Sequence, residues 1–176
     1  MKDSSEQNPF WAFSLQHYAT PGVAGICLTL QDKVELSVNI LLFALWLAER
    51  GRELDMVPLN HSEALRQCNE EVLLPLRSAR YSMKRIGMSM GQPKLYLTMK
   101  KAELEVERIE QKLLLRLAQD MPESKLTARV LAKANLIAYF NAAGVDFQQW
   151  LAEIERLIDL VLGEKDNNVF YISSGD

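Results

Sequence analysis

Apolar residues recur at helical spacing along most of this chain. The clearest run occupies six positions that lie three or four residues apart, namely Met99, Ala102, Val106, Ile109, Leu113 and Leu117. A second run, toward the C-terminus, comprises Phe147, Trp150, Leu151, Ile154, Leu157, Ile158 and Val161. Because such spacings place side chains on one face of an α-helix, both segments are predicted to form amphipathic helices.

Residues with capping preferences mark the predicted helices of the first third of the chain. Asn8 followed by Pro9 is typical of a helix start, and Thr20 followed by Pro21 repeats the signal. A third helix is predicted over residues 36–50. Its apolar run is shorter than the roughly 20 residues that a membrane span needs, so it is predicted to be a buried core helix.

A long helical hairpin is predicted over residues 60–119. Asn60 with Glu63 resembles a capping box and predicts the start of a long helix. Pro75 lies inside this helix and is expected to kink or divide it, because proline lacks the backbone donor. Residues 87–93, which include two glycines and a proline, are predicted to form the loop between the two arms.

The remaining segments complete an all-α prediction of about seven helices in one domain. A helix over 125–143 is followed by a second that Asp146 caps, and only residues 168–173 have the composition of a strand. The predicted organisation is a compact N-terminal helical part, a central hairpin, a C-terminal helix pair and a tail, at residues 8–58, 60–119, 124–163 and 164–176.

Charge is distributed unevenly along the chain. The formal net charge is −3, yet residues 72–102 carry no acidic residue and seven basic ones, Arg77, Arg80, Lys84, Arg85, Lys94, Lys100 and Lys101. This basic window predicts a positive patch that suits nucleic acid, an anionic membrane surface or an acidic protein. The alternative is a solvated basic face that only balances acidic neighbours within the fold.

Asn39 is the polar residue within the most apolar predicted helix. A buried amide must be hydrogen-bonded, and a structural bond to a neighbouring helix end is one interpretation. The other is a small-ligand pocket in the N-terminal half, which Asn39 would line with Trp11, Gln31 and Trp46.

No residue pattern indicates catalysis, a metal or a cofactor. His17 and His61 lie on different predicted helices, without further ligands at suitable spacing. Glu103 and Glu107 share a helical face among basic neighbours, and we predict a solvated surface rather than an acid/base pair. The protein is therefore not expected to be an enzyme, and no cofactor or metal is expected.

Two further features concern DNA binding by the C-terminal helices and the location of the protein in the cell. Gly144 fits the turn of a helix-turn-helix, but the helix after it is acidic and would be repelled by phosphates, so it is not expected to bind DNA. Cys27 and Cys68 are expected to be reduced thiols, and no secretory signal is visible, so the protein is predicted to be cytoplasmic.

The opening stretch carries a recognisable set of residues, Asn8, Pro9, Phe10, Trp11, Tyr18, Pro21, Gly22, Val23, Leu30, Gln31, Asn39 and Trp46. It resembles the opening of an uncharacterised proteobacterial family of short helical proteins, and the resemblance extends over residues 8–118. Ser37 stands where the family pattern has an acidic residue. The resemblance implies a bacterial, cytoplasmic protein without established chemistry.

The chain also resembles, more distantly, vibrio regulators of the type six secretion regulator A kind. That resemblance implies a part in transcriptional repression alongside nucleoid proteins. The leading prediction is thus a non-catalytic regulatory protein that acts through its basic window on DNA, weakly and without sequence specificity, or on an acidic protein partner.

Two alternatives remain open at this point. One is an adaptor or assembly protein that does not bind nucleic acid, and the other is a small-molecule binder or enzyme with a pocket in the N-terminal half. A homodimer is also predicted if the apolar stripe of the hairpin is wider than its own helices can bury.

Overall fold

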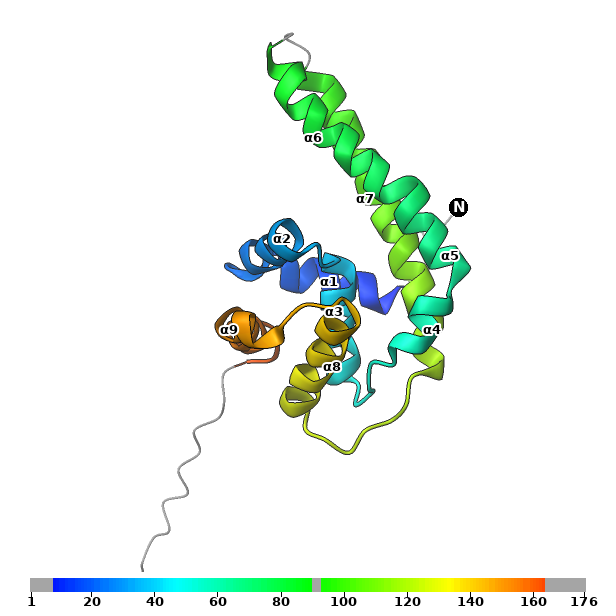
Figure 1. The fold of residues 1–176 in the computed structure, drawn as a ribbon, viewed down its shortest axis with the longest axis vertical. Coiled ribbons are helices and arrows are strands. Elements are labelled where there is room, and N and C mark those ends of the chain that lie inside the picture. Colours follow the sequence, from blue (N-terminus) through cyan, green and yellow to red (C-terminus); the bar gives the residue numbers. More distant parts are fainter. Residues whose placement is uncertain (1–7, 90–92, 164–176) are drawn as a thin grey trace, which may run out of the picture.

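The computed structural model describes residues 8–89 and 93–163, and these residues form α-helices joined by short turns. Within those two ranges no strand forms, and the only β-type pairing is an isolated bridge between Arg52 and Glu123. The all-α prediction is confirmed. Figure 1 shows a helical body from which one long hairpin projects.

The first two helices begin at different kinds of cap. The helix α1 (Pro9–Tyr18) starts as predicted, since the Asn8 side chain accepts a hydrogen bond from the Trp11 N–H at 3.0 Å. The helix α2 (Val23–Val34) starts later than predicted, because Thr20 and Pro21 form a turn and Gly22 is the N-cap. A Cβ atom at Gly22 would lie 3.1 Å from Leu160, so glycine permits close packing there.

The central element of the body is α3 (Val38–Glu49). All its residues from Leu41 to Ala48 are buried, which confirms the predicted core helix. It packs against α1, α2 and α8 (Ala128–Ala142), and the tilted rings of Phe10 and Phe43 contact each other in the core with centroids 5.3 Å apart. In the described residues, no helix is long and apolar enough to cross a membrane.

The first arm, predicted to begin at Asn60 and to be kinked or divided at Pro75, consists of more pieces than expected. These pieces are α4 (Met56–His61), α5 (Glu63–Arg66), the π-helix η2 (Gln67–Leu73) and α6 (Leu74–Ser89). The predicted cap at Asn60 is wrong, since the Ser62 hydroxyl accepts from Leu65 N–H and Asp55 caps α4. Pro75 was expected to kink or divide this helix, and the change from the π-helix to α6 falls at Leu74, next to Pro75, which lacks a backbone N–H.

The second arm of the hairpin is α7 (Pro93–Leu117), which runs antiparallel to α6 (Figure 1). A short 3₁₀ turn, η3 (Ala118–Asp120), leads on toward α8. The predicted start at Asp146 holds, but that residue caps the 3₁₀ turn η4 (Phe147–Trp150), and α9 (Leu151–Leu162) follows. The strand-like segment 168–173 lies outside the described residues.

The buried face of α7 is not the predicted apolar stripe. Within that stripe Ile109 is 51% exposed. The side chains of α7 that the fold buries are Glu103, Glu110, Gln111 and Leu114. This helix therefore turns a largely polar face inward, and this face organises the candidate site.

Candidate binding cleft

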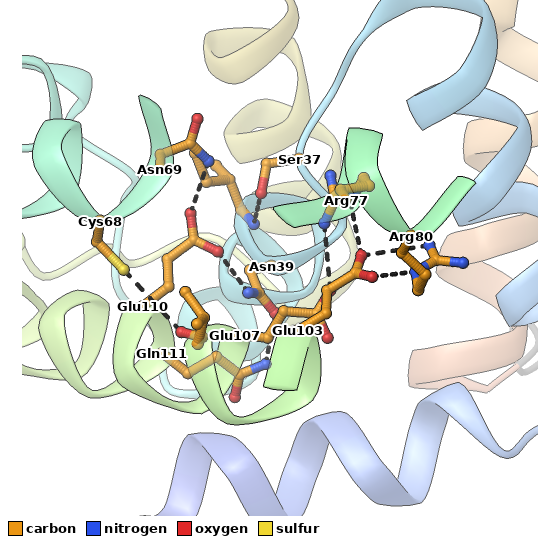
Figure 2. A network of polar contacts seen from close by, with 12 residues as sticks. Ser37, Asn39, Cys68, Asn69, Arg77, Arg80, Glu103, Glu107, Glu110 and Gln111 are labelled. Atoms are coloured by element: carbon orange, nitrogen blue, oxygen red, sulfur yellow. Dashed lines mark hydrogen bonds and ion pairs between the residues drawn. The ribbon is translucent and has the colours of Figure 1, made fainter. Parts of the chain in front are cut away.

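A network of polar side chains joins α7 to the rest of the protein (Figure 2). Glu103, Glu110 and Gln111 are only 5%, 2% and 2% exposed. The predicted solvated surface at Glu103 is therefore wrong, because the hairpin partner α6 and the N-terminal helices cover this face. A charged group can be buried without a large loss of stability only when it is paired and hydrogen-bonded. The partners of these side chains therefore determine whether their burial is compatible with a stable fold.

Two cations of the basic window neutralise the buried carboxylates. Arg77 donates from Nε to Glu103 at 2.9 Å and from Nη2 to Glu107 at 3.2 Å. Arg80 donates to both oxygens of Glu103, and both arginine side chains are about 15% exposed. Burial raises the pKa of Glu107 and the charge of Arg77 opposes that rise. Arg77 and Arg80 therefore hold the hairpin together.

The second half of the network is built around Glu110 and Asn39. The Glu110 carboxylate accepts hydrogen bonds from Asn39 Nδ2 at 2.5 Å and from Asn69 Nδ2 at 3.2 Å. Gln111 Nε2 donates to Asn39 Oδ1 at 2.7 Å and to Ser14 Oγ at 3.0 Å. Burial raises the pKa of Glu110, whereas the amide donors lower it. Asn39 is thus structurally bonded, to side chains in the middle of α7 rather than to a helix end.

Part of this network, including Asn39, Glu103 and Gln111, lines a cleft of about 750 Å³ between the N-terminal helices and the hairpin. Trp11 of α1, Gln31 of α2 and Asn39 of α3 line it on the body side. The cations that line it on the hairpin side are Arg77, Arg80, Lys84, Lys100 and Lys101. The two groups of residues predicted separately from the sequence therefore meet in one place.

Three predicted site residues lie elsewhere. Trp46 is absent from the cleft lining because it is buried in the core, where the guanidinium of Arg50 lies 4.2 Å from its ring centroid. Arg85 and Lys94 are exposed on the hairpin but are not part of the lining. The cleft thus contains three exposed lysines, Lys84, Lys100 and Lys101, beyond the two paired arginines.

Exposed apolar side chains line the same cleft. Leu97 and Leu104 of α7 are 53% and 45% exposed, and Leu15 and Leu28 on the opposite wall are 54% and 40% exposed. Tyr81, also in the lining, is 43% exposed. Leucines that remain open to water beside cations give a surface suited to a ligand that is both apolar and negatively charged.

The described residues do not form a metal-binding site. No group of three or more histidine, cysteine, aspartate or glutamate side chains is placed to hold a metal ion there. His17 lies on α1 and His61 on α4, as the separate helices of the sequence predicted. The Cys27 thiol is buried, and burial raises its pKa to about 12, so it is a poor nucleophile at neutral pH.

The buried acidic face of α7 was missed from the sequence. Positions 103, 107, 110, 111 and 114 have the same spacing of three and four as the apolar stripe, so they also define one helical face. A partial signal was present, because Arg77 and Arg80 share a face on the other arm of the same hairpin and two cations on one face suit an acidic partner. Which residues of α7 lie opposite them depends on the register of the two arms.

The chain belongs to the family described as "Protein of unknown function (DUF2390)", whose model matches residues 9–114. The matched region includes every lining residue of the cleft and excludes α8 and α9. The predicted membership of an uncharacterised family is confirmed. No curated protein and no solved structure matches the chain.

Proposed function

We propose that this protein is a non-catalytic regulator that represses transcription by binding an acidic segment of a protein partner in the cleft. The observation that carries the proposal is the presence of exposed lysines and exposed leucines together in one cleft. The distant resemblance to vibrio repressors supports the transcriptional part, and with it a cytoplasmic location in a bacterium.

An amphipathic acidic helix would satisfy both kinds of side chain at once. Its apolar face would cover Leu28, Leu97 and Leu104, and its carboxylates would reach the lysines at the rim. Helices bind in grooves in this way, and removal of the leucines from water would supply the main favourable free energy. The lysines would steer the approach and select against basic partners.

Weak, non-specific contact with duplex DNA is the second candidate. It is favoured by Arg85 and Lys94, which are exposed on the hairpin outside the cleft and extend the positive surface. Phosphates would pair with these cations in a salt-dependent manner. They would leave the cleft leucines in water, however, so this candidate explains less of the surface.

A small amphipathic anion is the third candidate. The cleft volume of about 750 Å³ lies within the range typical of ligand pockets, roughly 300 to 1,000 Å³. The aromatic side chains of Trp11, Tyr18 and Tyr96 are in the lining and suit an organic ligand.

The adaptor alternative differs from the leading proposal only in the process that the bound partner controls.

The experiment compares the wild type with the triple variant Lys84→Glu, Lys100→Glu and Lys101→Glu. Arg77 and Arg80 are left intact, because their loss would leave Glu103 buried without a partner and would confuse binding with folding. The matched control is Lys33→Glu, Lys112→Glu and Lys125→Glu, which makes the same charge change at exposed lysines outside the cleft.

The measurement is fluorescence anisotropy with a labelled acidic amphipathic peptide and, separately, a labelled generic DNA duplex, across a salt series. We expect the peptide to bind the wild type and the control alike and to bind the cleft variant at least about tenfold more weakly. Transcript profiles of a strain lacking the gene, complemented with each form, should show loss of repression only with the cleft variant.

The other outcomes separate the candidates. Binding of DNA but not peptide, lost in the cleft variant, would replace the leading proposal with the second candidate. An equal loss of peptide binding in variant and control would show that only net charge matters, and it would contradict a role for the cleft. If the peptide binds the cleft but transcript levels are the same with and without the protein, the protein would be an adaptor and not a transcriptional regulator.

A further inference from the structure

A second exposed apolar surface lies on the hairpin, on the side away from the cleft. It consists of two rows of residues spaced by seven, Val72, Ala79 and Ile86 on the first arm and Leu95, Ala102 and Ile109 on α7. The four large side chains of these rows are 47%, 39%, 47% and 51% exposed in chain order. None of the six residues lines the cleft.

Both rows belong to one face of the hairpin, here called the outer face. Arg77 and Arg80 contact Glu103, which places the middle of α6 beside the middle of α7. Ala79 and Ala102 are adjacent in sequence to two of these paired residues and are therefore at the same level. In an antiparallel pair, Ile86 then lies level with Leu95, and Val72 with Ile109.

The outer face carries no charge between these rows. Helical spacing places further uncharged side chains there, and the half-buried ones are Leu76, Met83, Met99, Val106 and Leu113. Glu105, three residues from Ala102 and four from Ile109, lies at the edge of this face, but the strip between the rows is uncharged and does not suit the acidic partner proposed for the cleft. It favours a partner surface that is equally apolar and uncharged.

The pattern of side-chain size is the same in both directions along the hairpin. Each row reads large, small, large, with alanine in the centre. A two-fold axis between Ala79 and Ala102 therefore brings the outer face onto an identical face, with large side chains meeting at both ends. Such self-complementarity is the requirement of a two-fold interface, and small central residues allow the helices to approach closely.

The size of the outer face fits a modest dimer. Fifteen residues on each helix extend over roughly 22 Å, and two adjacent helices are about 20 Å wide. The resulting area of roughly 400 Å² per copy, or about 800 Å² in total, is within the range of the largest apolar patches on monomers and corresponds to a weak, transient interface. The hairpin also projects from the body, so a second copy can reach it (Figure 1).

We propose that the protein forms a homodimer through the outer faces of two hairpins, which pack antiparallel as a four-helix arrangement. The cleft lies on the opposite side of each hairpin, so both clefts stay open in the dimer. This proposal does not rest on what the cleft binds. A two-fold dimer would present two partner-binding clefts, which would strengthen binding to a partner with two acidic segments.

The test is sedimentation equilibrium of the full chain over a concentration series up to about 1 mM, as a modest interface requires. The variant is Ala79→Glu with Ala102→Glu, which places like charges across the proposed axis while both residues stay exposed in the monomer. The matched control is Ala134→Glu with Ala152→Glu, at two exposed helical alanines outside the hairpin. Circular dichroism melts verify that each form is folded.

We expect the wild type and the control to shift from the 20.0 kDa monomer toward twice that mass, with a Kd that changes little with salt. The hairpin variant should raise the Kd at least about tenfold, because facing like charges oppose association. A wild type that stays monomeric throughout, or a hairpin variant that dimerises like the control, would overturn the proposal. A Kd that rises steeply with salt would also contradict it, since an uncharged interface is insensitive to screening.

Discussion

Replacement of Glu103 by glutamine is expected to destabilise the protein by about 3 kcal/mol. The Glu103 carboxylate is 5% exposed and is the shared acceptor of Arg77 and Arg80. Loss of its charge leaves the largely buried Arg80 without a carboxylate partner and Arg77 with Glu107 alone, and breaking a buried ion pair from one side typically costs about 3 to 5 kcal/mol. Thermal unfolding should show a melting temperature lower by about 6 to 12 °C.

The control for this prediction is Glu105→Gln, two residues along the same helix. Glu105 is exposed and pairs only with Arg108, so its loss should change stability by less than about 0.5 kcal/mol. Equal effects of the two substitutions would show that Glu103 is no more than a surface charge. That result would also remove the argument for leaving Arg77 and Arg80 out of binding tests.

Replacement of Asn39 by aspartate is expected to introduce a destabilisation that grows with pH. The Asn39 amide nitrogen lies 2.5 Å from a Glu110 oxygen, so the variant would place two carboxyl groups at hydrogen-bonding distance in a buried site. Two such groups cannot both ionise, and one of them keeps a raised pKa in the folded state. A shift of about two pKa units corresponds to about 3 kcal/mol.

The direction of the pH dependence follows from linkage. A carboxyl whose folded pKa exceeds its unfolded pKa costs nothing while both states are protonated, and its cost grows as the pH rises toward the folded value. The variant should therefore approach the wild type near pH 3, where both states are protonated, and fall about 3 kcal/mol below it by pH 8 in urea unfolding. Asn141→Asp, an exposed position in α8, should show little effect, and an equal loss at both pH values would refute the coupling.

Local signals were sufficient for most helix boundaries. Asn8 caps α1, Asp146 caps the turn before α9, and Gly51, just after α3, adopts a left-handed conformation with φ of 67°. Each of these depends on a few neighbouring residues and their backbone bonds, so the sequence contains the necessary information. The errors at Thr20 and Asn60 arose where a competing cap, Gly22 or Ser62, lay within two residues.

The role of the basic window could be predicted only in part. Its seven cations are visible in the sequence, and three of them, Lys84, Lys100 and Lys101, are exposed in the cleft. That Arg77 and Arg80 are held by Glu103 depends on which residues of α7 lie opposite them. This register is a long-range property, since it joins positions more than twenty residues apart.

By itself, the sequence determined the helical class of the described chain, the position of the hairpin and the family, because periodicity, caps and motifs are local properties. Only the tertiary structure decided that α7 buries Glu103 and Glu110 instead of its apolar stripe. Two faces of α7 have the residue spacing of a buried surface, and the sequence of this helix alone does not determine which one is buried. The face with the carboxylates is buried because α3 and α6 pack against it and provide Asn39, Arg77 and Arg80 as partners.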